Sequence, residues 1–215
     1  MLAALLIGGV SGGCIASRHS GGAAGTSPVV AVPESAMASL AVCQIWTPRV
    51  GGSLTPIGDG LAVTAGHVIR EETEIRIDGH PSRVRRIAGG GGIGAKDDDW
   101  AVLRVEVGRL RAPNQLDPSL PLRRGDAVYI AGFPGGVQTV YLGRVIGRPL
   151  WVSGSRDLVF IAIDGAPDLH GASGGPAAVW DPEAGWRVFG IYVGTWSPLG
   201  WRGYAVRRLP VDLGG

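Results

Sequence analysis

The sequence predicts an all-β protein in which many short strands form a sandwich or barrel. The first observation is composition, because the 215 residues include 37 glycines and 15 prolines, which suit strands joined by turns. The second is that apolar residues alternate or come in short runs from residue 40 onward. The third is that no window of about a dozen residues carries the apolar stripe of a helix.

Five segments carry the strand signal. In the first, Ile75 and Ile77 alternate with charged residues, which is the period of a strand with one buried face. The segment 109–126 is poor in strand signals and holds three prolines, so we expect it to connect two halves of the fold. The other four strand segments are rich in β-branched and aromatic residues, and they span 100–107, 127–133, 158–163 and 186–194.

The N-terminus predicts export. The apolar run 1–10 is far shorter than the roughly 20 residues of a membrane-spanning helix, and with the small residues after it the run resembles a signal peptide. Cys14 after "SGG" resembles the lipid-attachment cysteine of bacterial lipoproteins, although no Lys or Arg precedes the run and Ser11 stands where that family usually has Leu. Lipidation of Cys14, simple cleavage of the signal and a disordered apolar tail stay open.

The domain organisation follows from composition. Residues 17–35 are rich in Gly, Ser, Ala and Pro, so we read 1–36 as signal and flexible spacer and 37–215 as one folded domain. The net charge of +2 favours neither nucleic acid nor an anionic membrane surface. The only two cysteines, Cys14 and Cys43, lack metal-ligand spacing. No PDZ-like extension follows residue 215, so we expect no regulation by an appended domain in cis.

Chemistry is expected first at His67, one of four histidines, because it ends an apolar, strand-like run in a turn of small residues. Asp99 is the last of three consecutive aspartates and directly precedes a run that reads as buried. A carboxylate at such a junction is partly covered and needs a partner.

Ser173 lies in the segment Gly171-Ala172-Ser173-Gly174-Gly175-Pro176. A serine hydroxyl attacks only when a base removes its proton. Backbone N–H groups two residues apart point at one oxygen only in an unusual conformation, which glycine adopts without strain. The chain order His67, Asp99, Ser173 is that of the chymotrypsin triad and differs from the orders in subtilisin and the α/β-hydrolases.

Taken together, these motifs resemble those of the trypsin/chymotrypsin-like serine peptidases. Within that family the sequence is most similar in style to the short bacterial members. The resemblance covers roughly residues 40–212. It rests on "TAGHV", "DDWAVLRV", "HGASGGP", "AGFPGG…TVYLGRVIG" and "GWRGYAVR". It implies two antiparallel six-stranded β-barrels, about 37–112 and 121–215, with the active site in the cleft between them.

The resemblance also implies roles. His67 is expected as general base and acid, Asp99 as its orienting partner and Ser173 as the nucleophile, with the N–H groups of Gly171 and Ser173 as the oxyanion hole. The substrate is expected to be a protein or peptide, without metal or organic cofactor. The protein is expected to be bacterial and exported to the cell envelope or secreted, and Cys14 is the candidate membrane tether.

Two departures from the family pattern carry information. Ala172 stands where digestive members have the aspartate that pairs with a new N-terminus, so that mode of activation is not expected. Val193 stands where members often have a serine that supports the triad aspartate. A preference for basic residues at the cleavage site and one for small or medium apolar residues both stay open. The substrate pocket is expected at Pro167, Asp168, Tyr192, Val193, Gly194, Thr195 and Gly203.

Three rival hypotheses remain beside the endopeptidase. The first is a catalytically inactive homologue that binds peptides or proteins at the envelope. The second is an esterase on another fold, which the motif order disfavours. The third is a structural β-domain in which "GASGGP" is only a turn.

Overall fold

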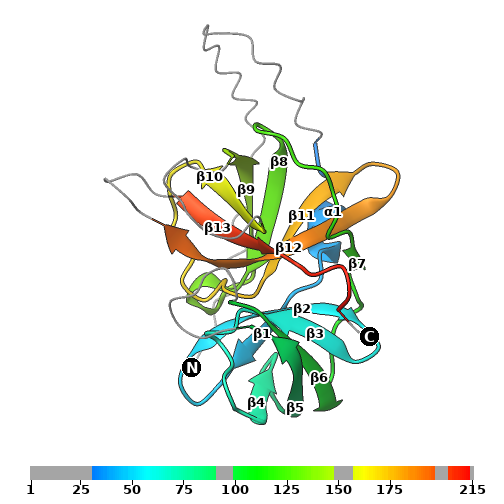
Figure 1. Cartoon of the computed structure of the whole chain (residues 1–215), viewed down its shortest axis with the longest axis vertical. Helices are drawn as coiled ribbons and strands as arrows, with labels where there is room; N and C mark the ends of the chain where they lie inside the picture. Colours follow the sequence, from blue (N-terminus) through cyan, green and yellow to red (C-terminus); the bar gives the residue numbers. More distant parts are fainter. Residues whose placement is uncertain (1–30, 91–98, 148–156, 197–202, 214–215) are drawn as a thin grey trace, which may run out of the picture.

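The computed structural model describes residues 31–90, 99–147, 157–196 and 203–213. Within them, strands form two closed barrels that lie one above the other in Figure 1. This confirms the predicted all-β class and the two six-stranded antiparallel barrels. The signal-like run, the candidate lipidation site Cys14 and residues 97–98 lie outside the described residues.

The first barrel has the strand order β1-β2-β3-β6-β5-β4 and closes where β4 pairs with β1. Its strand β4 alternates as the sequence predicted, since Ile75 and Ile77 are buried while Glu74 and Arg76 are exposed. The strands are β1 Cys43–Trp46, β2 Gly51–Gly58, β3 Leu61–Thr64, β4 Glu74–Ile77, β5 His80–Gly89 and β6 Ala101–Val107.

The second barrel has the order β11-β8-β9-β10-β13-β12 and closes through β11 and β12. The twelve-residue β12 serves both neighbours, because its first half pairs with β11 and its second half with β13. The strands are β8 Ala127–Gly132, β9 Thr139–Val145, β10 Leu158–Ile163, β11 Pro176–Asp181, β12 Gly185–Trp196 and β13 Gly203–Arg208.

The connection between the barrels lies where the prolines predicted it, between β6 and β8. It contains the two-residue strand β7 Gln115–Leu116, which pairs in parallel with β12. The Asn114 side chain before β7 is buried and fully bonded. Its amide nitrogen donates to the carbonyls of Ala41 and Pro56 at 2.8 and 3.0 Å, and its oxygen accepts the N–H of Ala41 at 3.0 Å. Asn114 therefore ties the entering chain to the first barrel.

The packed part of the chain starts somewhat before the expected Met37. The short helix α1 spans Glu34–Ser39, and the indole N–H of Trp186 donates to the carbonyl of Ala36 at 2.6 Å. Leu40 is fully buried in the same apolar cluster as Trp186. Composition alone could not show these contacts, because the partner residue is 150 positions away.

In the described part of the chain, no helix is long and apolar enough to cross a bilayer.

Candidate active site

His67 lies just after β3, in a tight turn of the first barrel. The N–H of Val68 donates to the carbonyl of Ala65 at 3.0 Å and closes the turn. Val68 and Ile69 are buried and anchor it, whereas the His67 side chain keeps 29 % of its surface exposed. The turn formed by "TAGHV" thus holds the His67 imidazole at the surface, anchored by the buried side chains that follow it.

Asp99 lies beside His67 because the strands next to them are paired. Thr64 at the end of β3 lies opposite Ala101 at the start of β6, which brings the residues just beyond these strand ends together. The Asp99 side chain is buried to all but 8 %. Its Oδ2 lies 2.6 Å from Nδ1 of His67, and its Oδ1 accepts the backbone N–H of His67 at 2.7 Å.

This arrangement determines which imidazole nitrogen is available. A carboxylate only accepts hydrogen bonds, so Nδ1 of His67 is the donor, and in the neutral imidazole the other ring nitrogen, Nε2, is the acceptor. Both oxygens of Asp99 are held by His67 itself. Val193, which stands where trypsin/chymotrypsin-like peptidases often have a serine, is 3 % exposed and packs among apolar residues of both barrels.

Ser173 belongs to the second barrel but docks on the first. Its carbonyl accepts the N–H of Ser53 in β2 at 2.8 Å. Gly52, the preceding residue of β2, has no room for a side chain, because a Cβ there would meet the side chain of Val68 at 2.8 Å and the Ser173 carbonyl at 3.1 Å. Ser173 and the turn of His67 therefore meet across β2.

Among the described residues, the Ser173 hydroxyl makes no hydrogen bond to His67. In proteins without bound substrate such catalytic hydrogen bonds are often long, and they tighten only when substrate binds.

In the segment 170–174, backbone N–H groups with an acceptor alternate with N–H groups that have none among the described residues. The N–H groups of His170, Ala172 and Gly174 donate to Asp168 Oδ1, the Leu169 carbonyl and the Tyr192 carbonyl, at 3.0, 2.9 and 2.7 Å. The N–H groups of Gly171 and Ser173 have no acceptor among the described residues. Two free donors on either side of one well-bonded residue form a place where a developing oxyanion can bind.

Gly171 makes this pattern possible. The bond from Ala172 N–H to the Leu169 carbonyl closes a four-residue turn, and Gly171 is its third residue with φ of 95°. A positive φ at that position is the requirement of a type II turn and favours glycine. A Cβ on Gly171 would also approach the carbonyl oxygen of Phe133 to 2.6 Å.

Ala172 is fully buried in the apolar core of the second barrel. A carboxylate is absent from this position, so the loop is held by packing and backbone hydrogen bonds in place of an ion pair.

The residues predicted to line a substrate pocket lie near one another but differ in exposure and in hydrogen bonding. Asp168 is exposed and its carboxylate accepts the His170 N–H, so a preference for basic substrates stays a prediction. The Tyr204 hydroxyl donates to the Pro167 carbonyl at 2.6 Å, and the Tyr192 and Tyr204 rings lie 6.3 Å apart inside the barrel. The remaining predicted residues follow along β12 and β13, with Val193 and Gly203 buried and Gly194 and Thr195 partly exposed.

Sequence reasoning missed the buried hydroxyls that join the two barrels. Ser53 and Thr55 of β2 are 0 % exposed and donate to the carbonyls of Gly171 and Gly174 at 2.9 and 2.8 Å. Their only signal was the placement of two hydroxyl residues two positions apart in the apolar-facing strand "GGSLTPIG".

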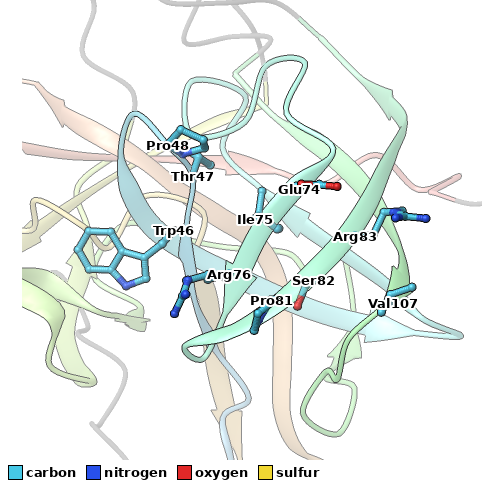
Figure 2. Close-up of a pocket in the computed structure, with 10 residues that line it drawn as sticks. All are labelled: Trp46, Thr47, Pro48, Glu74, Ile75, Arg76, Pro81, Ser82, Arg83 and Val107. Carbon is cyan, nitrogen blue, oxygen red and sulfur yellow. The ribbon is translucent and has the colours of Figure 1, made fainter.

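One cavity among the described residues lies away from His67, Asp99 and Ser173. This cavity of about 540 Å³ opens on the first barrel, and its lining comes from β1 and the turn after it, from β4 and β5, and from the end of β6 (Figure 2). Within the described ranges, no group of three or more His, Cys, Asp or Glu side chains could hold a metal ion.

A family model for the trypsin-like peptidase domain matches residues 52–191, which is more than half of the chain and includes His67, Asp99 and Ser173. The chain belongs to the trypsin-like peptidase domain family. Its members are proteases, so this trypsin-like domain belongs with hydrolases of proteins or peptides. No curated protein matches the sequence.

Several solved structures share the fold of this trypsin-like domain. The Rv3671c protease of M. tuberculosis in its inactive form matches with a TM-score of 0.58 at 20 % identity, over 84 % of this chain and 93 % of its own. The serine endoprotease of Yersinia pestis gives 0.59 at 22 % identity, over 83 % and 63 %. The human astrovirus serine protease gives 0.57 at 19 % identity, over 81 % and 93 %. At these identities the likeness shows the fold alone.

Proposed function

We propose that this protein is a serine endopeptidase that cleaves peptide bonds through an acyl-enzyme. His67 is its general base and acid, Asp99 orients the imidazole, and Ser173 is the nucleophile. The N–H groups of Gly171 and Ser173 stabilise the oxyanion. The N–H groups of Gly171 and Ser173 carry this proposal, because they have no acceptor among the described residues while those of His170, Ala172 and Gly174 are bonded, and a purely structural turn has no use for such a pair.

The proposed reaction starts at Nε2 of His67, the ring nitrogen that can accept a proton. Nε2 takes the proton of the Ser173 hydroxyl as Oγ bonds to the scissile carbonyl carbon, and the carbonyl electrons move to oxygen, facing the two N–H groups. The imidazolium is stabilised by Asp99 and returns its proton to the leaving amine, which breaks the C–N bond. Water then attacks the acyl-enzyme with His67 again as base, which releases the acid and restores Ser173.

The inactive-homologue alternative is not favoured. An inactive relative has no need for a carboxylate that bonds both the ring and the backbone of one histidine. Ala172 also supports a protein that is active without an activating cut, since the turn around it is held by hydrogen bonds.

The test is labelling of the folded protein by a fluorophosphonate probe. We expect the wild type to gain one phosphonyl group on Ser173 and to hydrolyse p-nitrophenyl acetate with a burst of one equivalent. Ser173→Ala removes the attacking oxygen and should abolish labelling and burst while its circular dichroism spectrum stays unchanged. Proposed endopeptidase activity is ruled out by a folded wild type that neither labels nor cleaves an unfolded protein such as casein.

We also propose that the protein is exported and attached to the cell envelope through a lipid on Cys14. The support is the apolar run followed by small residues and a cysteine. In its native host the mature protein should then carry the mass of acyl chains and partition into detergent, and Cys14→Ser should abolish both. A wild type that stays fully in the aqueous phase without added mass contradicts the tether.

A further inference from the structure

Ser53 lies at the point where the first barrel touches the loop that carries the two free N–H groups. It belongs to β2, is 0 % exposed, and is 118 positions away from Gly171. Each of its polar groups is bonded. Its N–H donates to the Ser173 carbonyl at 2.8 Å, and its own carbonyl accepts the Thr64 hydroxyl at 2.7 Å.

The Ser53 hydroxyl contacts the loop directly. It donates to the carbonyl of Gly171 at 2.9 Å. That carbonyl belongs to the peptide between Gly171 and Ala172, whose N–H is held by Leu169. The peptide that follows Gly171 is therefore fixed at both its oxygen and its nitrogen, so Gly171 cannot rotate freely about its ψ angle.

The same hydroxyl also acts on the other side of Gly171. It accepts the N–H of Phe133 at 3.0 Å, and the turn that follows Phe133 places the N–H of Gly135 3.3 Å from the carbonyl of His170. This carbonyl shares its peptide plane with the free N–H of Gly171. Holding the carbonyl toward Gly135 therefore points the N–H in the opposite direction.

We infer that Ser53 is a positioning residue for the oxyanion hole, because its hydroxyl bonds the peptide after Gly171 directly and supports the peptide before Gly171 through the turn that follows Phe133. This inference rests on the proposed function and adds a residue outside the triad to it. The N–H of Gly171 stabilises the negative charge that develops on the substrate carbonyl oxygen in the transition state. If this N–H is no longer held in position, the rate of the chemical step falls more than the affinity for substrate.

Thr55 offers a matched control. It lies on the same strand, is equally buried, and donates to the carbonyl of Gly174 at 2.8 Å. The N–H of that peptide belongs to Gly175 and is bonded to the Ala172 carbonyl at 2.9 Å. Thr55 therefore joins the barrels in the same manner as Ser53 but braces a peptide without a free donor.

The experiment measures acylation by p-nitrophenyl acetate under single-turnover conditions. Ser53→Ala should lower the acylation rate constant by about tenfold to a hundredfold, with the dissociation constant of the ester within about twofold of wild type. Its pH profile should keep the wild-type midpoint, because the His67–Asp99 pair is untouched. Thr55→Val should unfold at a similarly lowered urea concentration but acylate within about threefold of wild type.

Each outcome of this experiment supports or overturns the role of Ser53. Wild-type acylation in Ser53→Ala overturns the inference, and so does an equal loss of rate in Thr55→Val. If Ser53→Ala does not fold, Ser53→Cys takes its place, with a weaker donor of similar size and an expected intermediate rate. A wild type that never acylates defeats the proposed function and this inference together, whereas an active wild type with an unaffected Ser53→Ala defeats the inference alone.

Discussion

Replacing Asp99 by asparagine is expected to lower kcat by about four orders of magnitude without unfolding the protein. Asp99 accepts two hydrogen bonds from His67, one at each oxygen, within 2.7 Å. An amide offers one acceptor and one donor, so one of these bonds must be lost or the imidazole must move its proton to Nε2. Loss of a bond frees the imidazole from its fixed orientation, and a proton on Nε2 removes the acceptor that takes the serine proton. The burial of residue 99 keeps water from restoring the lost hydrogen bond.

The measurement is kcat for ester hydrolysis beside the thermal unfolding midpoint. Asp98→Asn is the control, because the neighbouring carboxylate in the sequence carries the same charge. We expect it to retain at least about a third of wild-type activity. Equal and small effects of the two substitutions would show that Asp99 is not the orienting residue.

The second large effect is expected from Gly174→Ala. Gly174 has φ of 89°, which an alanine adopts only with strain. A Cβ there would also overlap the carbonyl oxygen of Ser53 and the hydroxyl of Thr64, both buried in the first barrel. The loop would have to withdraw from the barrel, so we expect the free energy of unfolding to fall by about 3 kcal/mol and acylation to be lost.

Gly125→Ala separates the two causes. Gly125 has a similar φ of 94° but nothing within 4 Å of the position of an added Cβ. It should cost only about 1 kcal/mol in urea unfolding and leave acylation intact. Equal destabilisation by both substitutions would mean that overlap with the first barrel contributes nothing.

Much of the fold could be predicted because strands carry their signal locally. The predicted segment 158–163 is the strand β10, and 127–133 differs from β8 by one residue. Alternation of apolar and charged residues depends only on near neighbours in the chain. The helix α1 was not predicted, because six residues with a single buried side chain leave no helical stripe to detect.

The candidate site was only partly accessible in this way. His67, Asp99 and Ser173 were selected by their local segments and their order, and they remain predicted catalytic residues until Ser173→Ala and Asp99→Asn are measured. The support of Asp99 could not be foreseen, because Val193 removed the expected hydroxyl and nothing in the sequence indicates that both carboxylate oxygens bond to His67.

The sequence by itself determined the strand segments, the glycine-rich turn and the order of the three candidate residues. Only the tertiary structure decided which backbone donors of that turn have no acceptor among the described residues, and which buried hydroxyls bond to its carbonyls. The physical reason is separation along the chain. Ser53 and Thr55 meet the loop of Ser173 across 118 and 119 positions, and such contacts exist only after two separately patterned barrels have docked.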